Sequence, residues 1–224
     1  MNEKIIVVLD VSTRREALQL VNALRGQAGM FKVGSQLFMA EGPAMVKEIV
    51  EMGEKVFLDL KFNDIPNTVT HAVLEAAKLG VSMMTIHASG GRAMMEAVAK
   101  ADVKPLVVAV TVLTSLNAVG LLEVGVERPM QDQVRQLALL TKECGIDGVV
   151  CSPQEIELVR RAAGPGFTIV TPGIRLEGQA LNDQQRAATP GEAMARGADY
   201  LVVGRAITED ADPKAALGRL VGGL

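Results

Sequence analysis

The sequence predicts an α/β protein that folds as a (β/α)8 TIM barrel. Short runs rich in β-branched residues alternate along the chain with longer amphipathic segments rich in Ala, Glu, Lys and Leu. Strict alternation of this kind implies parallel strands that are joined by crossover helices. The 224 residues hold eight such units, close to the size of one barrel. We therefore expect a single domain over residues 1–224.

Eight runs are predicted as strands because each is short and apolar: Lys4–Asp10, Met30–Gly34, Lys55–Lys61, Met83–Ala88, Lys104–Val112, Gly148–Cys151, Thr168–Ile174 and Tyr200–Arg205. The helices predicted between and after them are Thr13–Leu24, Pro43–Met52, Asn67–Leu79, Arg92–Ala101, Gln131–Cys144, Pro153–Ala162, Pro190–Arg196 and Pro213–Leu220. Several of these helices are followed by a glycine, which suits a helix C-terminus. An open doubly wound sheet is the alternative, although no G-x-G-x-x-G follows the first strand.

Composition excludes several classes of protein. A hydrophobic content of 49% and a mean hydropathy of +0.25 argue against disorder. A formal charge of −3 gives no reason to expect a nucleic acid or a membrane as partner. The apolar runs Ile5–Leu9 and Leu106–Leu113 are too short for a signal peptide or a bilayer span, so we expect a cytoplasmic protein. Cys144 and Cys151 lack the spacing of zinc ligands, so no metal is predicted.

Polar residues concentrate where the predicted strands end. In a barrel the functional groups lie at the carboxyl ends of the strands. These ends carry Asp10, Lys32, Asp59, Lys61, His87, Thr114, Ser115, Arg175, Gly204 and Arg205. His87 either lines the pocket or is held by a hydrogen bond under the loops. This concentration of functional groups at one end of the strands predicts an enzyme or a ligand-binding protein.

The charged residues of the first three strands alternate in sign. Period-two alternation places Asp59 and Lys61 on one face of their strand. Together with Asp10, Lys32 and Asp64 they form a series in which each charge has neighbours of the opposite sign. Such neighbours keep lysines protonated and aspartates ionised. The alternative interpretation is a structural ion-pair network that closes the barrel mouth, with Asp64 serving only to start a helix.

The last two strands predict a phosphate site. Barrels often bind phosphate with the loops that follow strands seven and eight. Gly204 permits close approach of the backbone, and Arg205 can hold phosphate through a forked contact. A turn glycine beside a surface arginine is the alternative. The long polar stretch from residue 176 to 186 is predicted to be a lid in which Gln184 reaches inward, or else a disordered insert.

The motif Asp59-Leu60-Lys61-Phe62-Asn63-Asp64-Ile65-Pro66-Asn67-Thr68 resembles the D-x-K-x-x-D-I-P-N-T signature of orotidine 5′-phosphate decarboxylases. Further motifs of that family follow in order along the whole chain, among them Thr171-Pro172-Gly173-Ile174-Arg175. Ala206 and Gln36 depart from the pattern at sites where proline and glutamate are usual. The shorter D-x-K-x-x-D motif also occurs in phosphosugar decarboxylases and aldolases.

The resemblance implies the roles of the site residues. Catalysis would rest on Lys61, Asp59, Asp64 and Lys32, with Lys61 stabilising a carbanion at C6 and then protonating it. Substrate binding would involve Asp10, Lys32, Thr68, Thr114, Ser115, Arg175, Gln184, Gly204 and Arg205.

The resemblance also implies an activity and an assembly. The activity is the conversion of orotidine 5′-monophosphate to UMP in pyrimidine biosynthesis, without a cofactor. The assembly is a homodimer in which Asp64 and Thr68 enter the partner's site. A magnesium-dependent phosphosugar decarboxylase or aldolase, and a nucleotide-binding barrel without catalysis, are the alternatives.

Overall fold

The strands of the chain close into a parallel barrel in sequence order in the computed structural model, which describes residues 2–175 and 187–224. Within these residues the strands are β1 (Ile5–Val8), β2 (Met30–Gly34), β3 (Val56–Phe62), β4 (Met83–His87), β5 (Leu106–Val110), β6 (Gly148–Val150), β7 (Thr168–Thr171) and β8 (Tyr200–Val203). Each strand pairs in parallel with the next, and β8 pairs with β1. The predicted (β/α)8 barrel is confirmed.

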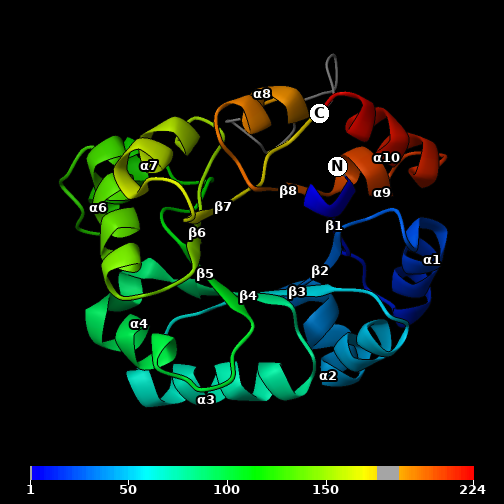
Figure 1. The fold of residues 1–224 in the computed structure, drawn as a ribbon, viewed down its shortest axis with the longest axis horizontal. Helices are drawn as coiled ribbons and strands as arrows, with labels where there is room; N and C mark the ends of the chain where they lie inside the picture. The colour runs from blue at the N-terminus through cyan, green and yellow to red at the C-terminus, as the bar shows by residue number, and fades with distance from the viewer. Residues whose placement is uncertain (1, 176–186) are drawn as a thin grey trace.

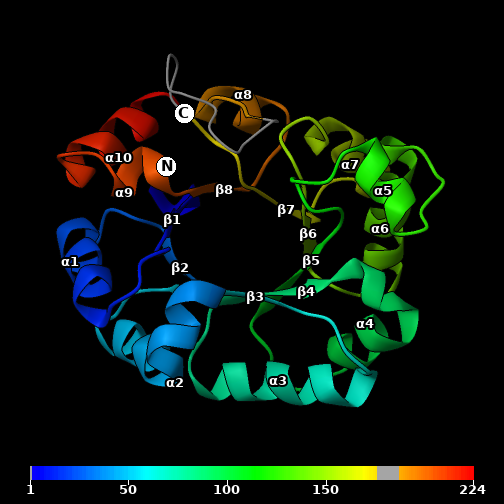
Figure 2. The ribbon, with the colours of Figure 1, turned by 180° about the vertical axis from the view of Figure 1, so that it is seen from behind.

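Helices surround the barrel on all sides (Figures 1 and 2). They are α1 (Arg14–Leu24), α2 (Ser35–Glu51), α3 (Pro66–Lys78), α4 (Gly91–Ala99), α5 (Ala118–Glu123), α6 (Met130–Glu143), α7 (Ile156–Ala163), α8 (Pro190–Ala195), α9 (Arg205–Thr208) and α10 (Pro213–Gly222). Two short 3₁₀ helices, η1 (Asn2–Lys4) and η2 (Ala88–Gly90), precede β1 and α4. Most predicted helix boundaries agree with these to within about two residues.

Three helical segments differ from the prediction. α2 begins at Ser35 rather than at Pro43, because a helical turn precedes a kink at Gly42, where φ is +68°. Gly42 can adopt this angle because it has no Cβ, and the following proline suits the start of a new helical run. The short helices α5 and α9 were not predicted, since six and four residues carry too little periodic pattern.

The apolar residues form two cores separated by the sheet. Side chains that point inward fill the barrel with Ile6, Val8, Met30, Phe57, Met83, Val108, Val170 and Val202. Their neighbours in sequence point outward and pack against the helices, as Ile5 and Val7 do. Burial of both faces explains why the strands read as continuous apolar runs. The inward positions that follow Val8, Met30 and Phe57 on their strands are charged, so the packed interior gives way to a polar mouth.

No helix within residues 2–175 and 187–224 has the length and apolarity that a bilayer crossing requires. Gln184 and the rest of the predicted lid lie outside the described residues, so the lid remains a prediction.

Candidate functional site

A cavity of about 580 Å³ opens at the carboxyl ends of the strands. This volume lies in the range of small-molecule sites. The apolar side chains of Val8, Phe57 and Val202, which belong to the barrel interior, form part of its lining. Charged groups from β2, β3 and the segments after β1, β7 and β8 form another part of the lining. The cavity is therefore an apolar pocket with charged groups gathered in it.

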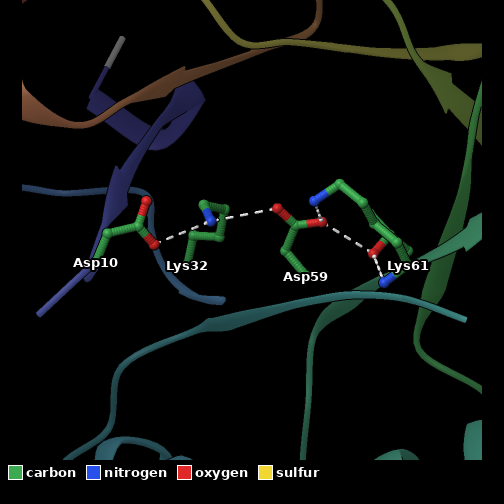
Figure 3. Close-up of polar contacts among 5 residues, drawn as sticks. Asp10, Lys32, Asp59 and Lys61 are labelled. Atoms are coloured by element: carbon green, nitrogen blue, oxygen red, sulfur yellow. Dashed lines mark hydrogen bonds and ion pairs between the residues drawn. The ribbon is translucent and has the colours of Figure 1, made fainter. Parts of the chain in front are cut away.

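Four charged side chains form a row across this mouth (Figure 3). The ammonium nitrogen of Lys32 lies 3.4 Å from Oδ1 of Asp10 and 3.2 Å from Oδ2 of Asp59. The ammonium nitrogen of Lys61 lies 2.8 Å from Oδ1 of Asp59. Lys32 and Asp59 are buried, whereas the Lys61 side chain is 37% exposed and that of Asp10 is 57% exposed. Asp59 thus lies between two cations, of which Lys61 is the more open to the cavity.

The surroundings of Asp59 favour its ionised form. Burial opposes ionisation and would by itself raise the pKa of this carboxyl. Attraction to Lys32 and Lys61 lowers the pKa, and so do hydrogen bonds from Lys61 and Thr85. The lowering effects prevail, and the pKa of Asp59 lies below its ordinary value of 3.8. The carboxylate is therefore charged at neutral pH before any ligand binds.

The contact between Lys61 and Asp59 depends on an irregularity of β3 and not on regular strand alternation. The pairing of β3 with β4 shifts between Leu58 and Phe62, and Lys61 has a φ of +54°. Its backbone N–H donates to the hydroxyl of Thr85 on β4, at 2.9 Å. The predicted proximity of Asp59 and Lys61 is observed, but it arises at a bulge.

His87 ends β4 beside the charged row and is half-buried. Burial lowers the pKa of His87, and the positive charge of Lys61 lowers it further, while Asp59 acts in the opposite direction. The pKa of His87 therefore lies below 6.5, and its imidazole is neutral at neutral pH.

The opposite side of the cavity is cationic. Pro172, Gly173 and Arg175 from the segment after β7 line it together with Gly204 and Arg205 from the end of β8. Burial lowers the pKa of Arg175, and repulsion by Arg205 lowers it further, against the attraction of Glu209 (which also lines the cavity). Two guanidinium groups close enough to repel each other favour an anion between them.

Other predicted site residues lie at the rim of the cavity or away from it. Thr114 lines the cavity, and the exposed Ser115 follows it in the chain. Asp64 and Thr68 are exposed and do not contribute to the cavity of their own chain. Asp64 accepts a hydrogen bond from the N–H of Ile65 (2.6 Å). Asp64 therefore does not join the charged row within one chain, and the assignment of Asp64 and Thr68 to the partner's site stays a prediction.

Thr85 is one of the polar residues near the site that the sequence analysis missed, and Thr208 and Glu209 of the cavity lining are two others. Thr85 is fully buried inside β4, whereas the predicted site residues lie where the strands end. Threonine is common in strands because it favours β structure, and nothing in the neighbouring sequence indicates that Thr85 contacts the site.

The fold and the cavity define the class of this protein. It is a (β/α)8-barrel protein with a cavity at the carboxyl ends of the strands, and this cavity combines an Asp/Lys row with a cationic side. The model of the orotidine 5′-phosphate decarboxylase / HUMPS family matches residues 3–220.

Individual relatives agree with that match. The orotidine 5′-phosphate decarboxylase of Syntrophotalea carbinolica is 52% identical over 98% of this chain and 93% of its own length. That of Moorella thermoacetica is 50% identical over 96% and 89%. The crystal structure of orotidine 5′-phosphate decarboxylase from Lactobacillus acidophilus superimposes with a TM-score of 0.86 at 36% identity, covering 98% of this chain and 97% of that one. The chain belongs to the orotidine 5′-phosphate decarboxylase / HUMPS family.

Proposed function

We propose that this chain decarboxylates orotidine 5′-monophosphate to UMP in the biosynthesis of pyrimidine nucleotides, and that it does so without a cofactor. Membership of the family and relatives about half identical over nearly the whole chain support the reaction. The observation that carries the residue assignment is the ammonium group of Lys61, which lies 2.8 Å from the ionised carboxylate of Asp59 inside the cavity.

The proposed orientation of the substrate follows from the charges. The phosphate binds at the cationic side, to Arg175, Arg205 and the backbone at Gly204. The ribose hydroxyls then reach Asp10 and Lys32, which are paired with each other at the mouth. This orientation directs the pyrimidine ring toward Lys61 and the remaining polar groups. Thr114 and Ser115 are assigned to its edge, and Gln184, beyond the described residues, to the phosphate.

The proposed chemistry uses Lys61 twice. Loss of CO₂ leaves the electron pair of the broken bond at C6, in a position where no adjacent carbonyl delocalises it. The ammonium group stabilises this carbanion electrostatically and then transfers a proton to C6, which gives UMP. Asp59, held ionised by its neighbours, disfavours the negative carboxylate of the substrate more than neutral CO₂. Binding energy from the remote phosphate helps to hold the ring against these charges.

We further propose that the active protein is a homodimer whose two sites each receive Asp64 and Thr68 from the partner subunit. Both residues are exposed and do not line the charged cavity of their own chain. Ile65, between them, has 66% of its surface exposed, so a second copy that packed there would bury apolar area. A second copy that covers Ile65 would bring Asp64 and Thr68 to a site they cannot complete alone.

Hybrid dimers test this assembly. Lys61→Ala and Asp64→Ala are each expected to be inactive, and mixing them under conditions of subunit exchange should restore activity. In a mixed dimer one site contains both substitutions and the other contains neither. Random exchange therefore predicts recovery to about a quarter of wild-type activity, because half of the dimers are mixed and one site in each is intact. No recovery, with exchange verified by mass, would contradict a shared site.

The decarboxylase assignment is tested by the loss of orotate-ring absorbance from orotidine 5′-monophosphate with EDTA present. Wild type is expected to turn over in chelator, and Lys61→Ala to lose turnover while it remains folded. Lys47→Ala is the matched control, since its ion pair with Glu51 at 3.7 Å is solvent-exposed. Chelator-sensitive turnover of a phosphosugar instead would indicate the magnesium-dependent alternative. Binding of the nucleotide without turnover would indicate a non-catalytic barrel.

The sequence and the barrel also support proposals on the domain organisation and the cellular location of the protein. We propose that residues 1–224 form one domain, because all eight described strands belong to the same barrel. We also propose that the protein acts in the cytoplasm without nucleic-acid or membrane partners, in keeping with its charge of −3.

A further inference from the structure

The backbone of Lys61 has an unusual conformation. Among the described residues it is the one non-glycine residue with a positive φ, at +54°. This left-handed region is unfavourable for a residue with a Cβ, and it persists only where the surroundings enforce it. Lys61 is also the residue whose ammonium group the proposed reaction depends on.

The pairing of β3 with the neighbouring strand β4 is irregular at Lys61. β3 pairs with β4 at Leu58↔Met84 and again at Phe62↔Ile86. Between these pairs β3 contains residues 59, 60 and 61, whereas β4 contains Thr85 alone. Three residues thus face one, and the regular ladder of backbone hydrogen bonds is interrupted there.

The hydroxyl of Thr85 makes hydrogen bonds at the place where the backbone ladder is interrupted. It accepts a hydrogen bond from the N–H of Lys61 at 2.9 Å and donates one to Oδ1 of Asp59 at 3.0 Å. The same carboxylate oxygen accepts from the ammonium group of Lys61 at 2.8 Å. Thr85 is fully buried, so water does not substitute for its hydroxyl without a rearrangement. One hydroxyl therefore ties the backbone of Lys61 to the group that its own side chain contacts.

We propose that Thr85 is a positioning residue, which fixes the left-handed backbone of Lys61 and the carboxylate of Asp59 so that the ammonium group points into the cavity. This inference rests on the proposed decarboxylase function for its kinetic consequences, but not for its geometry. Thr85 does not line the cavity and so acts through Asp59 and Lys61. A displacement of about 1 Å at a reacting group lowers rates by roughly 100-fold, so small movements here matter.

Thr85→Val tests the hydroxyl with little change in shape. It leaves the N–H of Lys61 without its acceptor and removes one donor from Asp59. The expected result is a fall in kcat of roughly 10- to 100-fold. KM should change by less than about threefold, because the phosphate contacts lie across the cavity on the β7 and β8 side. Thr85→Ser keeps the hydroxyl and should recover kcat to within about threefold of wild type.

Thr141→Val is the matched control. Thr141 is equally buried, but its hydroxyl donates to the carbonyl of Leu137 within α6. This variant loses a buried hydroxyl away from the site and should keep the wild-type kcat. If Thr85→Val does not fold, Thr85→Ala is measured in the same way.

The decisive experiment combines kinetics with a crystal structure of Thr85→Val or Thr85→Ala. We expect Lys61 to leave the left-handed region, or its ammonium nitrogen to move away from Asp59. An unchanged Lys61 with kcat within twofold of wild type would overturn the proposal, as would a Thr85→Ser variant as slow as Thr85→Val. Wild type without turnover on orotidine 5′-monophosphate would instead refute the proposed function, and the crystal structure would still decide the positioning role.

Discussion

Replacing each lysine beside Asp59 by methionine should separate stability from catalysis. Lys32 and Asp59 are both almost fully buried and lie 3.2 Å apart. At an effective dielectric constant near 20 their attraction is about 5 kcal/mol before desolvation is subtracted. Removing one partner of such a buried pair costs about 3–5 kcal/mol, because the other charge remains in a poor environment. Lys32→Met should therefore lower the free energy of unfolding by about 3 kcal/mol.

Lys61→Met should behave differently although its contact with Asp59 is shorter, at 2.8 Å. The Lys61 side chain is 37% exposed, so solvent screens the pair and its removal costs about 1 kcal/mol. For a chain of this size the melting temperature should fall by about 10 °C in Lys32→Met and by about 3 °C in Lys61→Met. Lys61→Met should nonetheless abolish turnover.

The measurement is urea denaturation at neutral pH and fixed protein concentration, because the apparent stability of the proposed dimer would depend on concentration. Lys47→Met, at an exposed pair with Glu51, controls for the loss of a surface charge and should leave the midpoint unchanged. Equal losses from Lys32→Met and Lys61→Met, or a larger loss from Lys61→Met, would refute the argument from burial.

Three further outcomes follow from the contacts. The pKa of His87 is lower in the folded protein than in the unfolded chain, so the unfolded chain binds more protons below pH 6.5 and stability falls as the pH drops from there. Between pH 7 and 5 the urea midpoint of His87→Gln should therefore fall less than that of the wild type. In Gly34→Ala the new Cβ would lie 2.9 Å from the ammonium nitrogen of Lys32, and kcat/KM should fall roughly 10-fold with little loss of stability. Arg160→Met removes hydrogen bonds to three carbonyls and to Asp199, far from the cavity; calorimetry should show about 2 kcal/mol lost, with kcat unchanged.

The barrel could be predicted because its determinants are local. Each strand is a short apolar run with both faces buried, and each crossover helix has its own periodicity and a boundary marked by Gly or Pro. The start of α2 was missed for a physical reason. Pro43 is a good first residue of a helix, so the sequence favours a start there, whereas Gly42 allows an earlier turn to join it through a kink.

The site was predictable only as far as strand ends identify it. The topology brings Asp10, Lys32 and Asp59 to one mouth, and any barrel would do the same. The conformation of Lys61 was not predictable, because alternation assumes a regular strand and the bulge depends on a threonine from the next strand. Whether a loop residue such as Asp64 turns toward its own cavity depends on tertiary packing, which sequence spacing does not encode.

Asp59 occupies the one position of the row with a cation on each side, and its ionisation state can be measured directly. The two lysines and Thr85 lower its pKa below 3.8 despite burial. A carboxyl of this kind stabilises the fold fully above its unfolded pKa, and that contribution is lost only as pH falls through the lower folded value. The negative charge that the proposed reaction uses is therefore in place before the substrate arrives, which is the condition for electrostatic preorganisation. It follows that an acid limb of kcat/KM between roughly pH 5 and 7 would come from another group, such as the substrate phosphate. Carbon-13 NMR of the Asp59 carboxyl should show no titration in that interval, and a midpoint within it would contradict the proposed role of the two lysines.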